Sequence, residues 1–224
     1  MELKNIVVSE ELRKAWPLFT GCAVYVDFEN TEHSDELWQE IDAFVAEMRT
    51  QYTVDSIKQI SGIEATRKAY KACGKDPSRY RPSNEQLVRR TLQGKELYQI
   101  DTAVDLINLA SMKYGYSIGG FNRDKIEGDT ICLGIGKAGE PYEGIGRGVL
   151  NIEGMPVYRD AVGGIGTPTS DNERTKMSMT TTHLLALVNG YDGNREQTRA
   201  CADFIVELME KYAKGKNCRV VEFQ

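Results

Sequence analysis

Glycine is distributed very unevenly along this chain of 224 residues. Of its 21 glycines, 14 lie between Gly115 and Gly166. Glycine weakens helices and favours turns, so this part of the chain is a poor candidate for long helices. Short runs of β-forming residues alternate with turns there and just beyond, at residues 129–135, 147–152, 155–160 and 183–188. This pattern predicts antiparallel strands joined by hairpins.

The sequence on either side of the glycine-rich region predicts mainly helices. Helical segments are expected at residues 36–52, 60–74, 83–95, 101–115 and 194–215. Two further strands are expected at residues 21–28 and 218–223. We therefore expect one α+β domain over residues 1–224, with helices packed on mixed or antiparallel β-sheets. Its parts are a mostly helical N-terminal region at 1–75, a core at 80–190, and a C-terminal helix and strand at 191–224.

The composition is typical of a soluble globular protein. Hydrophobic residues make up 41% of the chain and charged residues 27%. No stretch approaches the roughly 20 consecutive apolar residues that cross a bilayer, and the first residues lack the pattern of a signal peptide. The five cysteines are widely scattered and form no CxxC pair. We therefore expect a cytoplasmic protein with free thiols, no membrane partner and no metal site.

The net charge of −5 argues against a protein that coats nucleic acid through bulk electrostatics, and we expect no DNA partner. One local segment, residues 71–90, is nevertheless basic. It supplies the candidate RNA-binding residues Arg79, Arg81, Arg89 and Arg90. The alternative is a solvated loop and helix face that has no partner.

Two features indicate other chemistry only weakly. GIGKAG at residues 134–139 has the spacing of a dinucleotide-binding loop, but EPY follows it where that fingerprint requires a helix. His33 and His183 stand alone, and the sequence contains neither a GxSxG nor an HExxH motif. A cysteine–histidine pair that forms only in space stays open. We therefore expect no cofactor.

The segment 160–185, DAVGGIGTPTSDNERTKMSMTTTHLL, concentrates glycines, hydroxyls and charges. Gly163 and Gly164 give the backbone freedom to approach a ligand, and their amides could hold a developing oxyanion. Asp171 and Glu173 could orient a water molecule or bind an ammonium group. The alternative is a tight turn, TPTSDNE, with Asp171 or the serine before it as cap, leading into a strand.

A longer stretch, residues 89–146, carries a more specific order of motifs. A helix with VDLxN is followed by a loop, FxxDKIEGD, a strand, GE and a glycine-rich hairpin. This order resembles the B3/4 domain, the tRNA-binding and editing module of the bacterial phenylalanyl-tRNA synthetase beta subunit. The resemblance runs from about residue 80 to 180. The matching residues are Val104, Asp105, Asn108, Phe121, Asp124, Lys125, Ile126, Gly128, Gly139, Glu140, Asp160, Gly163, Gly164 and Glu173.

The resemblance implies a B3/4 fold and a tRNA or aminoacyl-tRNA partner, without aminoacylation activity. It implies catalytic roles for Gly163, Gly164 and Glu173. It implies substrate-binding roles for Asn108, Gly119, Gly120, Glu140, Asp160, Ser170 and Asp171. The sequence departs from the family in that the family histidine falls on Gly119 and the family aspartate on Asn122.

Three functions follow from these patterns. The first is a freestanding hydrolase that deacylates mischarged aminoacyl-tRNA. The second is a module that binds RNA or an amino acid and has lost catalysis, which the departure at Gly119 favours. The third is a small-molecule-binding protein without a nucleic-acid partner.

Overall fold

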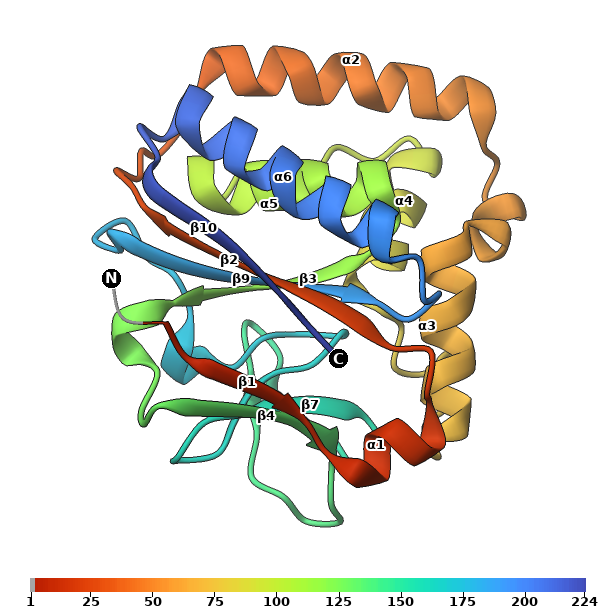
Figure 1. Ribbon diagram of the computed structural model, residues 1–224. Helices are drawn as coiled ribbons and strands as arrows, with labels where there is room; N and C mark the ends of the chain where they lie inside the picture. Colours follow the sequence, from red (N-terminus) through yellow and green to blue (C-terminus); the bar gives the residue numbers. More distant parts are fainter. Residues whose placement is uncertain (1–2) are drawn as a thin grey trace.

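Two stacked β-sheets and a layer of helices form the protein in the computed structural model, which describes residues 3–224. The helices are α1 (Glu10–Ala15), α2 (Asp35–Gln51), α3 (Ser61–Ala72), α4 (Ser83–Leu92), α5 (Thr102–Tyr114) and α6 (Arg195–Tyr212). Figure 1 shows α2 outermost, with α5 and α6 between it and the first sheet. The second sheet lies on the far side of the first (Figure 1).

The first sheet is antiparallel, and its central strands are buried on both faces. Its strand order is β10 (Lys216–Phe223), β2 (Thr20–Asp27), β9 (His183–Gly190) and β3 (Ser117–Asn122). In β2, Val24 and Val26 pack in the core cluster with the helices, whereas Ala23 and Tyr25 pack in the cluster shared with the second sheet. Because successive side chains of a strand point to opposite faces, a strand between two layers must be apolar throughout. This explains the uninterrupted run CAVYV.

The second sheet mixes parallel and antiparallel pairs. Its order is β1 (Asn5–Val8), β4 (Thr130–Ile135), β7 (Pro156–Arg159) and β8 (Gly164–Gly166), and only β1 and β4 run parallel. Two short strands, β5 (Glu143–Gly144) and β6 (Gly148–Val149), form a separate ribbon. Short 3₁₀ turns occupy Ser56–Gln59, Arg123–Lys125 and Glu173–Thr175.

Local chemistry fixes the ends of the helices that later matter for the site. The side chain of Asp101 accepts a hydrogen bond from the Val104 amide and so caps α5. Gly115 ends the same helix with a φ of 73°, a left-handed conformation that glycine adopts without strain. Ser34 caps α2 in the same way as Asp101 caps α5. The face of α5 that carries Asn108 lies next to α4.

The architecture confirms the predicted α+β fold with helices on mixed and antiparallel sheets. All five predicted helices are present, but the run at 147–152 forms only the two-residue strand β6. Strands β1 and β3 were not predicted. None of the helices in residues 3–224 is both long enough and apolar enough to cross a lipid bilayer.

Candidate functional site

A small cavity of about 140 Å³ lies between α4, α5, the edge strand β3 and the turn at residues 167–171. Apolar side chains of the two helices and of β3 form part of its wall, and polar groups from α5 and the turn form the rest. The cavity is lined by Ser83, Leu87, Ile107, Asn108, Ser111, Ile118, Thr167, Ser170 and Asp171. It is therefore a small hollow of mixed polarity at the edge of the first sheet.

Among residues 3–224, Asp171 is the only carboxylate that lines this cavity. Its Oδ2 accepts a hydrogen bond from the Gly120 amide at 2.9 Å, and its Oδ1 accepts none from the described side chains or amides. The residue as a whole is partly exposed, whereas its carboxyl group is enclosed by protein. Burial raises the pKa of Asp171 to about 7, and the Gly120 bond offsets only part of that rise. Near neutral pH the carboxyl group is therefore present in both protonation states.

Two glycines make room for the Asp171 carboxylate. A Cβ atom at Gly166 would lie 2.9 Å from Asp171 Oδ1, and one at Gly119 would lie 3.4 Å from the same atom. The same added atoms would also lie 2.6 Å from the ring of Phe121. A larger residue at either position would therefore displace the carboxylate or the ring beneath it.

Asn108 connects the cavity to a wider groove on the surface. It projects from α5, and its side-chain amide makes no hydrogen bond with any residue in the described part of the chain. Asn108, Ser83 and Leu87 line both the cavity and the groove, so the two hollows adjoin. An amide without a protein partner at this junction is available to a ligand that occupies both.

The groove has a volume of about 770 Å³ and is strongly basic. It is lined by Arg81, Arg89, Arg90, Lys95 and Arg147, and none of the carboxylates of residues 3–224 lines it. Arg90, Lys95 and Arg147 form no ion pair with a described residue. In a chain with a net charge of −5, this local excess of positive charge makes the groove a candidate site for a negatively charged partner.

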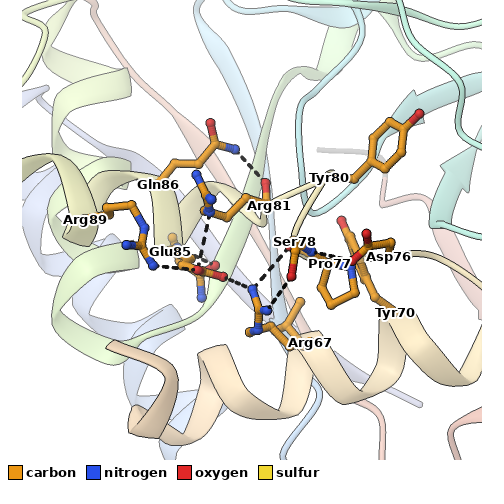
Figure 2. Close-up of polar contacts among 12 residues, drawn as sticks. Arg67, Tyr70, Asp76, Pro77, Ser78, Tyr80, Arg81, Glu85, Gln86 and Arg89 are labelled. Carbon is orange, nitrogen blue, oxygen red and sulfur yellow. Dashed lines mark hydrogen bonds and ion pairs between the residues drawn. The ribbon is translucent and has the colours of Figure 1, made fainter. Parts of the chain in front are cut away.

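One buried carboxylate, Glu85, holds the arginines at one end of the groove (Figure 2). Its side chain is only 1% exposed and accepts from Arg67 at 2.8 Å and Arg89 at 3.2 Å, with Arg81 at 3.5 Å. Glu85 lies in the first turn of α4, where the helix dipole also favours a negative charge. Because three arginines share a single carboxylate, positive charge remains at the surface after the pairing.

Tyr98 and Arg90 form a stacked pair beside these arginines. The guanidinium carbon of Arg90 lies 3.9 Å from the centroid of the Tyr98 ring. Arg90 also donates to the Tyr98 hydroxyl at 3.2 Å and, through Nε, to the carbonyl oxygen of Glu96. The pair therefore has a defined geometry even though Tyr98 is 65% exposed.

The structure brings several of the predicted site residues together. Asn108, Ser170 and Asp171 line the cavity, and Gly119 and Gly120 contact Asp171 from β3. Three of the predicted RNA-binding arginines line the adjoining groove: Arg81, Arg89 and Arg90. The fourth, Arg79, lies in another hollow, beside Tyr80.

The predicted catalytic glycine turn lies away from the cavity. The Gly163 amide donates to Asp160 Oδ1 at 3.1 Å, so it is already occupied. Gly164 packs against the ring of Tyr142. Asp160 is held by Arg174 at 2.7 Å and by backbone amides. These contacts shape the turn between β7 and β8, and neither Gly163 nor Gly164 lines the cavity or the basic groove.

The two predicted glutamates also lie outside the cavity. Glu173 Oε1 accepts a hydrogen bond from the Gly146 amide at 3.2 Å. Gly146 lines the groove, whereas Glu173 does not. Glu140 forms an ion pair with Arg159 at 2.6 Å. Each of these carboxylates is therefore committed to a protein partner.

The turn at 167–171 is capped differently from the sequence expectation. The Thr167 hydroxyl accepts from the amides of Thr169 and Ser170 at 3.3 and 3.1 Å, and Asn172 caps the following 3₁₀ turn. Asp171 therefore caps nothing. Its carboxylate points instead toward Gly120 and the cavity.

No cysteine–histidine pair forms at the cavity within the described residues. His183 contacts Asp124 at 2.8 Å, and His33 lies in a surface loop. Burial raises the pKa of Cys22 to about 12 and that of Cys73 to about 11, so both thiols stay protonated. The site therefore contains no activated thiol.

Sequence reasoning missed Lys95, Tyr98 and Arg147. Lys95 and Tyr98 lie in the connection between α4 and α5, and Arg147 lies about 50 residues further on, in the turn between β5 and β6. The RNA-binding expectation stopped at Arg90, the last residue of the basic segment 71–90. The sequence contains no local pattern that would have joined the two segments.

Comparisons with known proteins bear on the fold. A family model described as the B3/4 domain matches residues 65–214. A solved structure, an N-terminal fragment of the phenylalanyl-tRNA synthetase beta-subunit from Pyrococcus horikoshii, is similar with a TM-score of 0.51 and 15% sequence identity. The match covers 100% of this chain and 52% of that one, so this chain spans about half the length of its structural neighbour. No curated protein matches the sequence.

Proposed function

Because the chain belongs to the B3/4 domain family, as its sequence predicts, we propose that it binds the aminoacylated 3′ end of a tRNA and hydrolyses mischarged aminoacyl esters. One observation carries the proposal. The basic groove adjoins a small cavity lined by Asp171 and Asn108, and neither Asp171 Oδ1 nor the Asn108 amide has a hydrogen-bond partner among residues 3–224. If the phosphates of an RNA strand lay in the groove, the group at the end of that strand would lie in the cavity.

The groove supplies the contacts to the phosphates. Arg90, Lys95 and Arg147 keep their charge free because they have no carboxylate partner among the described residues. Neutralising phosphates with such residues releases counterions, so binding should weaken as the salt concentration rises. The chain as a whole has a net charge of −5, so a nucleic acid would be attracted to locally basic surfaces such as this groove.

The cavity sets the size of the reacting group. Its volume of about 140 Å³ is close to the roughly 150 Å³ that accommodates a benzene-sized molecule. This space must also hold the ammonium group, the α-carbon and the ester carbonyl, so it would take an aminoacyl group with a small side chain more readily than one with a large aromatic side chain.

Asp171 and Asn108 would divide the chemistry of ester hydrolysis. Asp171 Oδ1 would take a proton from a water molecule as that water attacks the ester carbonyl carbon, and its pKa of about 7 suits this role. The Asn108 amide would donate to the oxyanion that develops on the carbonyl oxygen. Collapse of the tetrahedral intermediate would then release the amino acid and return a proton to the ribose oxygen.

A non-catalytic binding role is the second candidate. Gly119 replaces the family histidine, and the Gly163 amide is occupied by Asp160. Both observations favour a protein that retains the groove and the cavity but no longer cleaves the ester.

A panel of mischarged aminoacyl-tRNAs separates these candidates. We expect deacylation above the buffer rate for at least one substrate with a small side chain, with a rate that rises toward pH 7 and then levels off. Asp171→Asn and Asn108→Ala should each lower the rate about 100-fold or more without loss of tRNA binding. Asp203→Asn, on an exposed face of α6, is the matched control. Binding without deacylation would select the second candidate, and absence of any tRNA binding would refute both.

A further inference from the structure

Tyr98 is an exposed aromatic ring that an arginine fixes at the basic groove. Arg90 stacks 3.9 Å from the centre of the ring and donates to its hydroxyl. Arg90 is anchored in turn on the backbone carbonyl of Glu96. One face of the ring is therefore covered by the guanidinium group, and the 65% exposure of Tyr98 must come from its other face and edge.

A ring of this kind, in this position, suits an unpaired nucleobase. Sites for single-stranded nucleic acid combine a positively charged groove with aromatic side chains on which bases stack. Both elements are present here, because Tyr98 lines the same groove as Arg89, Lys95 and Arg147. Bases within a duplex already stack on one another and offer no free face, so the ring adds nothing to duplex binding.

We infer that Tyr98 is a stacking platform for a base in the unpaired 3′ end of an RNA. The inference rests on the proposed function and extends it, because it names a single strand as the ligand and a specific residue as its anchor. The order of the stack is Arg90, Tyr98 and the base. Stacking at Tyr98 would fix the strand in the groove and so hold its terminal ribose near Asn108.

The probe for this inference is an RNA hairpin with a short unpaired 3′ tail, in which 2-aminopurine replaces each tail base in turn. The fluorescence of 2-aminopurine falls when it stacks. We expect wild-type protein to quench at least one tail position, and Tyr98→Ala to remove that quenching and weaken binding about 5- to 150-fold, the range for loss of one stacked base. Tyr98→Phe keeps the ring and should keep both properties.

Matched variants separate stacking from charge. Tyr52→Ala removes an exposed tyrosine that lies outside the groove and should bind as the wild type does. Arg147→Glu should weaken binding and reduce its dependence on salt, whereas Tyr98→Ala should weaken binding with an unchanged salt dependence. Arg219→Glu, on the exposed edge strand β10, is the control for charge reversal.

The outcomes for the two proposals differ. If the RNA binds and Arg147→Glu weakens it while Tyr98→Ala binds as the wild type does, the stacking platform is wrong and the proposed function stands. Equal affinity for the tailed hairpin and for a blunt duplex would likewise overturn the platform. If the wild-type protein binds neither RNA at low salt, both proposals are wrong.

Discussion

Asp171→Asn removes a titratable group from the wall of the cavity while keeping its size. Burial raises the pKa of Asp171 from its ordinary value of 3.8 to about 7 in the folded protein. The folded state therefore holds this proton more tightly than the unfolded chain does, and the free energy of unfolding falls as the pH rises between these two values. The difference between 3.8 and about 7 corresponds to about 4 kcal/mol in total.

The asparagine variant lacks this dependence, so its advantage over the wild type should grow with pH. Below about pH 4 the Asp171 carboxyl group is protonated in both states and contributes little to the difference. Above about pH 7 the wild type must bury a charge that, among the described residues, accepts a hydrogen bond from the Gly120 amide alone. Between about pH 4.5 and pH 8 the stability difference should therefore increase by about 3 kcal/mol in favour of the variant.

Urea unfolding followed by circular dichroism, at a series of pH values, measures this difference. Other groups titrate alike in both proteins, so their contributions cancel when the two curves are subtracted. Asp203→Asn, an exposed aspartate paired with Arg199, should give a nearly constant difference from the wild type. A constant difference for Asp171→Asn as well would mean that the Asp171 carboxylate is well solvated or paired, and it would remove the basis for its proposed role.

Two further variants test the surroundings of the site. Glu85→Ala should lower the free energy of unfolding by about 3–5 kcal/mol, because it leaves arginines packed without their shared carboxylate, and Glu85→Gln should lower it less. Glu64 forms an exposed ion pair with Lys68 and provides the control. Glu64→Ala should change the free energy of unfolding by less than about 1 kcal/mol in the same urea assay. Gly166→Ala should cost about 1–3 kcal/mol and shift the apparent pKa of Asp171, followed by carboxyl NMR, because the added methyl group meets its Oδ1. Gly163→Ala has open space around it and should leave stability unchanged, and a loss equal to that of Gly166→Ala would contradict the packing described here.

The sequence predicted the helices well because their signals are local. Periodic apolar positions and capping residues such as Ser34 and Asp101 belong to the same segment as the helix they define. Strand β3 was missed because Gly119 and Gly120 lie in its centre, where glycine is unfavourable. A side chain at Gly119 would collide with Phe121, a contact that only the folded structure reveals. Strand β1 is four residues long and pairs with β4, more than 100 residues away, which no local pattern indicates.

The site was predictable only in part, for a related reason. Asn108 and Asp171 could be singled out from the resemblance and from the chemistry of the turn. The groove could be identified only from the folded structure, because the turn that carries Arg147 and the connection that carries Tyr98 are far apart in the sequence and meet only in space. Counting the charged residues of the basic segment was also insufficient, because it does not show which of them are buried. Glu85 appears in the sequence as an acid that weakens the basic segment, yet it is buried and instead orients the arginines.

Glu85 and Asp171 are carboxylates near the groove with very different surroundings, and this contrast supports the proposed role of Asp171. Glu85 is compensated by three arginines, as a buried charge must be if it is to stabilise the fold. Asp171 receives one hydrogen bond from the Gly120 amide and forms no ion pair with a cation among residues 3–224. Stability alone would favour a neutral side chain there, and glycines at two neighbouring positions keep the space for the acid open. The Asp171 carboxylate lowers the stability of the fold, yet the fold keeps space for it at the end of a basic groove. Such a residue is best explained by a role toward a bound molecule, as proposed above.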